Sequence, residues 1–352
     1  MAPEFGSDFD QIPLVPQEVL RKHHVHEPND TRFRSAARLL QALWREDRQL
    51  PLGSYKRVDG RLAKLGSRIT TTAGRAGGNF LSPEIAHLTK RAIIYREIGA
   101  AIDQERLLSN LLSSMPLTFN LLGPLALDLK LATAVCHEIL PGFDGTVGRI
   151  LFEHSPGRGD VRYTADGTAF DALIRYRSAA GKRGFIAIET KYSEAMQEPV
   201  PPMRPRYEEL THASGLYIDP GSPHLRADPF QQLWREHLLA QTMLQNDLYD
   251  EGTFLFIAPK LNWYAQNAAR AYACQLDEPK AGHPAFLNVQ LETVVEAIRA
   301  AGSTELADKL HRRYCDFWLV DGEIELEVFG PKATSPPSSK PRIKRKASEF
   351  SA

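Results

Sequence analysis

Several features that mark common classes of protein are missing from this 352-residue sequence. Its three cysteines, Cys136, Cys274 and Cys315, are far apart, and no Cys-x-x-Cys pair occurs. An odd number of scattered cysteines argues against a disulfide framework and against a structural zinc site, and it favours a reducing cytoplasm. No run of 18 apolar residues occurs either, so no membrane span is expected.

A net charge is also lacking. Lysine plus arginine number 43, and aspartate plus glutamate also number 43. This balance argues against a protein that coats nucleic acid through bulk charge, although a basic groove can coexist with an acidic remainder. Apolar residues make up 43% and charged residues 24%, which is ordinary for a folded protein. The length suffices for one large α/β domain or two smaller domains.

Helical patterns dominate the first 140 residues, and short β-rich segments follow. Apolar residues at helical spacing predict helices over residues 30–47, 83–113 and 117–140, the last interrupted at Gly123-Pro124 and ended by Pro141-Gly142. Ser82-Pro83 is a good helix start. Three glycine-bounded segments then predict strands: residues 147–154, 168–177 and 184–192.

The remainder predicts a long connection over residues 194–228, a helix over 228–247 and a fourth strand over 253–259. Helical segments near 261–275 and 288–315 and a strand over 323–329 complete the expectation. The predicted organisation has these parts: a flexible N-terminus (1–30), a helical N-terminal region (31–115), an α/β core (116–265), a C-terminal α/β elaboration (266–330) and a disordered basic tail (331–352).

The second and third predicted strands hold the residues most indicative of chemistry. Side chains alternate between the two faces of a strand, so Glu189 and Lys191 share one face while Ile186 and Ile188 point to a core. A carboxylate and an ammonium inside an apolar strand need a reason, because an unpaired buried charge is costly.

The pairing of these two strands suggests a metal site. If they form a hairpin with its turn near Ala180, residues whose numbers sum to about 360 face each other, which sets Asp171 opposite Glu189. Two facing carboxylates repel unless a cation lies between them, and oxygen ligands suit Mg²⁺ or Mn²⁺. Such an ion can polarise a phosphoryl oxygen and activate a water, while Lys191 orients that water or neutralises developing charge.

The arrangement of these residues, with an aspartate on one strand of a hairpin and Glu-x-Lys on the next, resembles the motif of the PD-(D/E)XK nuclease superfamily. Asp171, Glu189 and Lys191 match its motif positions. Four segments are similar in sequence to a bacterial restriction-endonuclease-like branch: residues 119–124, 152–158, 170–172 and 188–192. Phe170 stands where the motif has proline. The resemblance covers roughly residues 85–265. It implies an α/β fold: a restriction-endonuclease-like αβββαβ core with a central mixed sheet, here of four strands, plus a helical N-terminal extension and a C-terminal elaboration.

The resemblance also implies further site residues. A glutamate from the helix before the first strand is expected, and Glu138 is the preferred candidate over Glu153. A glutamine at the start of the second helix would be Gln231 or Gln232, with Arg235 nearby. Ordinary alternatives stand beside these roles, since Glu138 can be a surface residue, Glu153 a paired strand charge and the glutamines simple helix polarity.

The sequence therefore predicts a Mg²⁺- or Mn²⁺-dependent endonuclease that hydrolyses phosphodiester bonds, with DNA as the expected partner. Arg175 and Arg177 are expected to contact phosphate. Two alternatives stay open: a catalytically silent module of the same fold that binds nucleic acid or a protein, and an unrelated scaffold in which the motif is a salt bridge. A homodimer and a protein partner in a defence system are hypotheses that rest on the resemblance alone.

Overall fold

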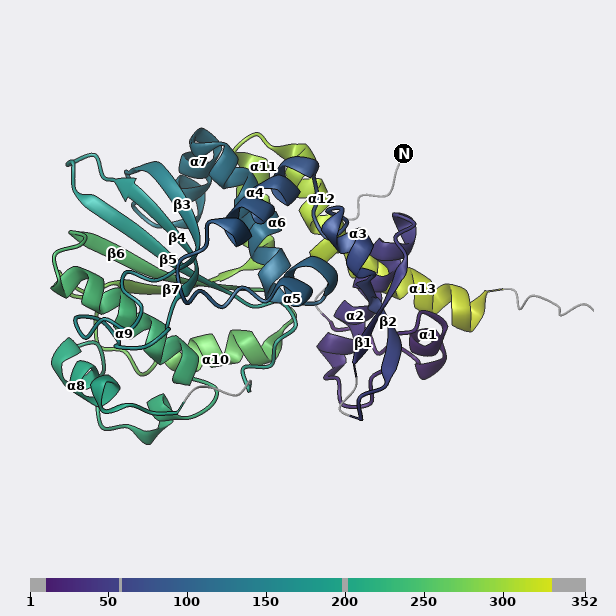
Figure 1. The fold of residues 1–352 in the computed structure, drawn as a ribbon, viewed down its shortest axis with the longest axis horizontal. Helices are drawn as coiled ribbons and strands as arrows, with labels where there is room; N and C mark the ends of the chain where they lie inside the picture. Colours follow the sequence, from purple (N-terminus) through teal and green to yellow (C-terminus); the bar gives the residue numbers. More distant parts are fainter. Residues whose placement is uncertain (1–10, 57–58, 198–201, 331–352) are drawn as a thin grey trace, which may run out of the picture.

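A computed structural model describes residues 11–56, 59–197 and 202–330 of the chain. Within them, five strands form a mixed sheet in the order β3-β4-β5-β6-β7 (Figure 1). Strands β3 to β5 are antiparallel, and β5, β6 and β7 are parallel. Their bounds are β3 Thr146–His154, β4 Phe170–Arg177, β5 Arg183–Thr190, β6 Glu251–Ala258 and β7 Ala285–Gln290.

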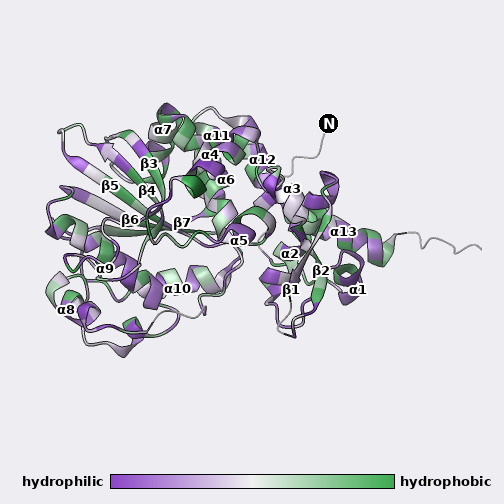
Figure 2. Ribbon diagram, in the orientation of Figure 1, coloured by the Kyte–Doolittle hydropathy of each residue, from purple (hydrophilic) through white to green (hydrophobic). Residues whose placement is uncertain are grey.

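Helices cover both faces of this sheet (Figure 1). One layer contains α6 (Ser114–Leu127), α7 (Leu129–Ile139) and α11 (Leu291–Ala300), and the other contains α8 (Pro205–Ser214), α9 (Gln231–Gln245) and α10 (Trp263–Ala273). Alternation along β5 supplies both cores: Ile186 and Ile188 lie in the first, and Phe185 and Ala187 lie in the second. Figure 2 shows the corresponding hydrophobic colour along the strands.

The predicted αβββαβ order is confirmed by α7, β3, β4, β5, α9 and β6 in sequence. The expectation of four strands was wrong, because β7 adds a fifth. Residues 285–290 pair with β6 in parallel, from Thr253↔Ala285 to Ala258↔Gln290. A parallel edge strand of this kind is determined by pairing with a distant segment, which the local sequence pattern does not reveal.

The β4–β5 hairpin has the predicted register. Arg177 pairs with Arg183 and Ala172 with Ile188, so facing residues sum to 360. The turn closes at Gly181, whose φ of 78° favours glycine. This register sets the start of β4 beside the end of β5, where the predicted motif lies.

The N-terminal region forms a second body with its own small sheet (Figure 1). It comprises α1 Gln17–Lys22, α2 Arg32–Asp47, β1 Leu52–Lys56, β2 Leu62–Ile69 and α3 Thr71–Arg75, and α4 Pro83–Ile94 and α5 Gln104–Ser109 lead to the central sheet. The expectation of a flexible segment up to residue 30 was wrong for residues 11–30, since Val19 and Val25 are fully buried. Residues 1–10 lie outside the described part. The hairpin β1–β2 was not predicted.

The C-terminal elements return to this N-terminal body. Helix α12 (Thr304–Tyr314) contacts α2, and α13 (Trp318–Phe329) contacts α1 and α2. The predicted strand over residues 323–329 was wrong. Glu323 and Glu327, one helical turn apart, both accept hydrogen bonds from Lys22 at 2.8 Å, a pairing that only the helix allows. The predicted basic tail, 331–352, lies outside the described residues.

The other differences are local. The helix expected over residues 83–113 is divided into α4 and α5, and the connection over 194–228 contains α8 and the short 3₁₀ turn Pro223–Arg226. Helix α6 passes through Pro124 and ends at Leu127, and α7 follows at an angle of 117°. In the described part of the chain, no single helix is long and apolar enough to cross a membrane. The two helices of this bent pair, taken together, reach that length and apolar composition.

Candidate active site

Three carboxylates lie side by side at one edge of the central sheet. Phe152 and His154 of β3 pair with Ala172 and Phe170 of β4, which sets Glu153 opposite Asp171. The register of the next pair, continued by one residue, sets Asp171 opposite Glu189. The end of β3, the start of β4 and the end of β5 therefore present Glu153, Asp171 and Glu189 on three adjacent strands.

Asp171 is fixed by the strand beside it. Its Oδ2 accepts hydrogen bonds from the backbone N–H of Thr190 at 2.9 Å and from the Thr190 hydroxyl at 2.6 Å. Both donors approach the same oxygen, and Asp171 remains half-buried. The other oxygen, Oδ1, takes part in neither of these hydrogen bonds.

Glu189, Lys191 and Gln232 form a closed hydrogen-bonded triangle. Lys191 Nζ donates to Glu189 Oε1 and to Gln232 Oε1, and Gln232 Nε2 donates to Glu189 Oε1, each at 2.7 Å. Glu189 is 3% exposed and Lys191 is 6% exposed. The ion pair is thus buried, unlike the pair on a solvated sheet face that the salt-bridge alternative expects.

Helix α9 adds a fourth carboxylate. Gln232 Nε2 also donates to Glu236 Oε1 at 2.9 Å, while Glu236 Oε2 is buried and has no hydrogen-bond partner among the described residues. We call Glu153, Asp171, Glu189 and Glu236 the carboxylate cluster. Burial raises the pKa of Glu189 and of Glu236, and the charge of Asp171 raises both further. Fully ionised, the cluster would carry more negative charge than Lys191 alone can balance, so it needs either a cation or bound protons.

Lys191 keeps its proton in this setting. Burial alone would lower the pKa of Lys191, but the carboxylates of Glu189, Glu194 and Glu236 outweigh it, and the pKa is raised. Lys191 is therefore a fixed cation, able to orient a water or stabilise an anion, and not a neutral base.

Glu194 anchors the segment that follows Lys191. Its side chain accepts from the backbone N–H groups of Tyr192 at 2.8 Å and Ser114 at 3.0 Å and from Arg106 Nη2 at 3.0 Å. Burial opposes ionisation, but Lys191, Arg106 and these N–H groups hold the pKa of Glu194 below its ordinary value. Strand β5, α5 and the start of α6 are thereby joined behind the site.

Glu153 has an unusual backbone. Its φ of 49° is rare for a residue other than glycine, and strained positions of this kind gather at functional sites. Burial, and then the charge of Asp171, raises the pKa of Glu153 to about 7. Arg158 Nη2 donates to its carbonyl oxygen at 2.7 Å, and the backbone of Ala101 hydrogen bonds to its carboxylate.

The structure does not bring Glu138 to these residues. Glu138 is exposed on α7, and it is absent from the charges that shift the pKa of Glu153 and Glu189. Glu153, the second choice from the sequence, occupies the third carboxylate position instead. Helix α7 ends at Ile139, before β3 begins, and its buried face is formed by Ala132, Val135 and Cys136.

Of the residues predicted on α9, only Gln232 reaches the motif. Gln231 is buried and donates to the carbonyl oxygen of Arg226 at 3.1 Å. Arg235 lies over the ring of Tyr207 at 4.7 Å and donates to the carbonyl oxygen of Pro202 at 3.1 Å.

Arg175 and Arg177 are exposed near the opposite end of β4. Arg175 stands over the ring of Tyr249 at 5.9 Å, and Arg177 donates to the carbonyl oxygen of Gly181 at 3.0 Å. Six residues separate Arg177 from Asp171, which is roughly 20 Å along an extended strand. Arg175 is four residues from Asp171, roughly 13 Å along the strand, and the phosphate contacts expected of both arginines stay predictions.

Sequence reasoning missed three residues that the structure places at the site: Glu236, Glu194 and Thr190. Glu236 is four residues after Gln232, so helical spacing was a signal that could have found it. Thr190 lies between Glu189 and Lys191, and alternation places its side chain on the opposite face. Nothing in the sequence indicates that its hydroxyl bonds Asp171.

The donor set fits a hard divalent cation bound mainly through water. Among the residues described, no group of three or more His, Cys, Asp or Glu side chains stands close enough to hold an ion. Asp171 and Glu189 each keep one carboxylate oxygen outside the hydrogen bonds given above. Mg²⁺ is commonly bound by one or two carboxylates while it retains several waters. The surplus negative charge of the carboxylate cluster also requires a cation or a proton.

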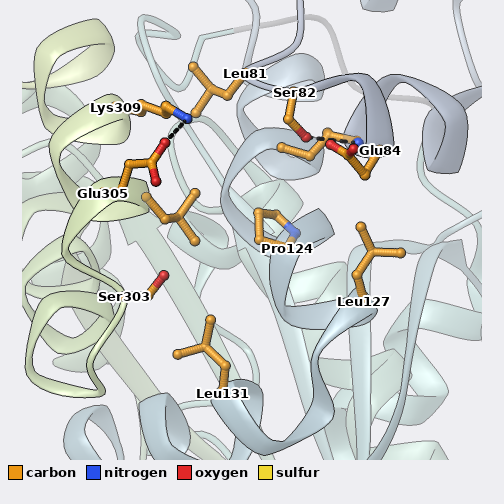
Figure 3. A pocket seen from close by; sticks show the side chains of 11 residues that line it. Leu81, Ser82, Glu84, Pro124, Leu127, Leu131, Ser303, Glu305 and Lys309 are labelled. Atoms are coloured by element: carbon orange, nitrogen blue, oxygen red, sulfur yellow. Dashed lines mark hydrogen bonds and ion pairs between the residues drawn. The ribbon is translucent and has the colours of Figure 1, made fainter.

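Two of the cavities that lie outside the motif have mainly apolar walls. One, of about 330 Å³, is bounded by α4, α6 and α12 and has mainly apolar walls that include Leu81, Leu127 and Leu131 (Figure 3). The carboxylate cluster does not line it. The other, of about 560 Å³, lies between α10 and the segments that flank the motif.

The mixed sheet and the Asp, Glu and Lys at its edge define a restriction-endonuclease-like α/β fold. A family model of the PD-(D/E)XK nuclease superfamily matches residues 28–316, well over half of the chain. The chain belongs to the PD-(D/E)XK nuclease superfamily, which confirms the resemblance seen in the sequence. Comparisons with curated proteins and with solved structures found no match.

Proposed function

We propose that this protein is a Mg²⁺- or Mn²⁺-dependent endonuclease that hydrolyses phosphodiester bonds in DNA. Family membership supports nuclease activity on nucleic acid. The observation that supports metal dependence is the carboxylate cluster, in which four acidic side chains face one lysine. A divalent cation would balance that charge.

Asp171 and Glu189 would hold the ion. We infer that the additional acidic residue of the site is Glu153 and not Glu138. When bound, such an ion polarises a phosphoryl oxygen and lowers the pKa of a bound water. Thr190 holds one oxygen of Asp171, so the other is directed to the ligand. Glu153, half-buried beside Asp171, is placed to exchange a proton at the site, and without a bound cation its burial and then the charge of Asp171 raise its pKa to about 7.

Lys191 supplies a fixed positive charge beside the reacting phosphate. Its Nζ is bound by Glu189 and Gln232 at 2.7 Å, so its position is set before substrate arrives. Preorganised charge of this kind stabilises the charge that develops in the transition state. Gln232 bonds both partners of the ion pair and is therefore a positioning residue.

The free cysteines, Cys136, Cys274 and Cys315, fit the cytoplasmic location inferred from the sequence. The homodimer and the defence-system protein partner that the resemblance implies stay predictions. Size-exclusion chromatography with light scattering would test the first.

Cleavage of plasmid and linear DNA with Mg²⁺, Mn²⁺ or EDTA tests the proposal. We expect metal-dependent cutting that falls by roughly 10²–10³-fold in Lys191→Met, because one preorganised charge is removed. Asp171→Asn should lose cutting in Mg²⁺ as well. Far-UV circular dichroism of each variant separates lost chemistry from lost folding.

Each of two active-site substitutions has a matched control: Lys182→Met for Lys191→Met, and Glu138→Gln for Glu153→Gln. Lys182→Met removes an exposed lysine at the hairpin turn, and Glu138→Gln removes the exposed helix carboxylate. Both should cut like the wild type, whereas Glu153→Gln should be impaired. Cutting that persists in EDTA or survives Lys191→Met and Asp171→Asn would contradict the assignment. Folded wild-type protein that never cuts would favour the silent-module alternative.

A further inference from the structure

The cavity of about 560 Å³ opens beside the motif, on the α9–α10 side of the sheet. Its volume falls in the range of about 300–1,000 Å³ that is typical of small-ligand pockets. One face of α10 forms one wall, and two short segments form the other. The lining residues are Ala195, Gln197, Asp228, Pro229, Phe230, Trp263, Tyr264, Asn267, Ala268 and Ala271.

Two aromatic side chains stand at this wall without being buried. Trp263 and Tyr264 are each 54% exposed at the start of α10. Large aromatic rings are ordinarily among the most deeply buried side chains, and here Trp234 and Tyr272 are fully buried nearby. An adjacent pair of exposed rings on a cavity wall is a surface suited to stacking on a flat ligand.

Both walls are tied to the catalytic motif. Asn262, directly before Trp263, donates through Nδ2 to the carbonyl oxygens of Tyr192 at 3.0 Å and Glu194 at 2.9 Å. Tyr192 directly follows Lys191 in the chain. On the other wall, Phe230 precedes Gln232 by two residues. The cavity therefore has a fixed position relative to Lys191 and Gln232.

The polar groups at the cavity identify the kind of ligand. Asn267 and Gln197 offer amides, and Asp228 offers a carboxylate acceptor. Amides suit the edge of adenine, and a carboxylate suits the amino group of cytosine. Neither lysine nor arginine is among the lining residues, so the cavity is built for a base and not for a phosphate.

We propose that this cavity receives one unpaired nucleobase of the nucleic acid that is cut at Asp171 and Glu189. The inference rests on the proposed nuclease function and deepens it. An accepted base must leave its stack, so the substrate has a single-stranded or locally opened region beside the scissile phosphate. Stacking on Trp263 and Tyr264 supplies binding that is tolerant of sequence, and the polar groups add a preference for bases with amino groups.

Tryptophan fluorescence provides a direct test that needs no cleavage. Trp44 and Trp234 are buried, and Trp318 is 43% exposed on α13. In a Trp318→Phe background, Trp263 is the remaining tryptophan of high exposure in the described structure. A short single-stranded DNA titrated in EDTA should quench its emission, and the same DNA with abasic sites should not.

Affinity measured by anisotropy gives the second readout. Trp263→Ala should weaken binding of single-stranded DNA by roughly tenfold, the effect of losing one stacked base. Trp263→Phe should recover much of it, and Trp318→Phe should change nothing. Both Trp263 variants alter an exposed helix-start residue, so thermal unfolding should match the wild type.

Separate results would overturn the two proposals. If Trp263→Ala binds as tightly as the wild type, or the abasic strand quenches equally, the cavity does not hold a base, and metal-dependent cutting in the same preparation would leave the nuclease proposal standing. Equal affinity for a free nucleoside monophosphate and for the oligonucleotide would also overturn it, since the ligand would then be a free nucleotide. If base-dependent quenching is seen without any metal-dependent cutting, the cavity inference stands and the nuclease proposal fails.

Discussion

Two buried polar clusters of this protein differ in how fully their groups are paired. On α12, the fully buried Arg313 donates to the backbone carbonyl of Asn79 at 2.7 Å, to the Asn79 side-chain oxygen at 2.6 Å and to Gln41 Oε1 at 3.3 Å. Its guanidinium also lies 4.0 Å from the centre of the Trp44 ring. We call these residues the Arg313 cluster.

The carboxylate cluster has the opposite character. It combines like charges on adjacent strands, an unpaired oxygen on Glu236 and a strained backbone at Glu153. Buried groups that serve only stability are ordinarily satisfied by partners within the protein. A surplus of one charge is retained where a bound ion or substrate supplies the balance, so pairing alone distinguishes the structural cluster from the candidate site.

The largest effect is expected from Arg313→Met. It leaves Asn79 Oδ1 and Gln41 Oε1 unpaired, each at about 1–3 kcal/mol, while the Asn79 carbonyl keeps its hydrogen bond from Asn120, so the free energy of unfolding should fall by about 3 kcal/mol or more. Urea unfolding measures this loss. Arg312→Met, at the neighbouring and half-exposed position, should change stability by no more than about 0.5 kcal/mol. Equal effects of the two would show that the Arg313 cluster is not structural.

The pH dependence of stability tests a second fully hydrogen-bonded buried group, His237 on α9. Its Nδ1 lies 3.0 Å from the Tyr272 hydroxyl and its Nε2 lies 3.0 Å from the Pro284 carbonyl, an arrangement that suits the neutral ring. Burial lowers the pKa of His237 from 6.5 to about 4. The unfolded chain therefore binds more protons between pH 6.5 and 4, and stability is lost as the pH falls through that window.

The expected loss from this histidine is about 3 kcal/mol, because folding lowers its pKa from 6.5 to about 4. Urea unfolding of the wild type and of His237→Gln at pH 7 and pH 4 gives the difference. The variant should lose less stability on acidification, whereas the half-exposed His311→Gln should behave as the wild type does. An unchanged pH dependence in His237→Gln would refute this account.

The smallest effect is expected from Glu236→Gln in the carboxylate cluster. Burial and the neighbouring carboxylates raise the pKa of Glu236 well above its ordinary value, so an amide of the same shape replaces a group already reluctant to ionise. Without metal, the free energy of unfolding should stay the same or rise by up to about 1 kcal/mol. A clear loss of stability would make this cluster resemble the Arg313 cluster and weaken the comparison.

Local sequence signals predicted the part of the site that local structure builds. Alternation and a glycine turn are enough to set Asp171 opposite Glu189 and to place Lys191 beside it, and the hairpin confirms that register. The resemblance added Gln232. Glu236 was missed although it lies one helical turn after Gln232, because the contact of this face of α9 with Glu189 depends on tertiary packing.

Sequence patterns also gave wrong predictions where the structure depends on contacts that the local sequence does not show. Residues 323–329 alternate glutamate with apolar residues, which is typical of a strand, yet they form part of helix α13, in which Glu323 and Glu327 both bind Lys22. Glu138 was preferred over Glu153 because a helix carboxylate was expected. A positive φ at the end of β3 directs Glu153 toward Asp171, and such a backbone state leaves no mark in the sequence.

The return of α13 to α1 has a consequence for how the chain is made. His23 bonds Glu323 through Nε2 at 2.9 Å across a separation of 300 residues. At about 5–20 residues per second, the ribosome delivers that partner roughly 15–60 s after the histidine. During this interval α1 and α2 have been made while the surface that faces α13 is uncovered, and it is covered once residues 318–329 have followed.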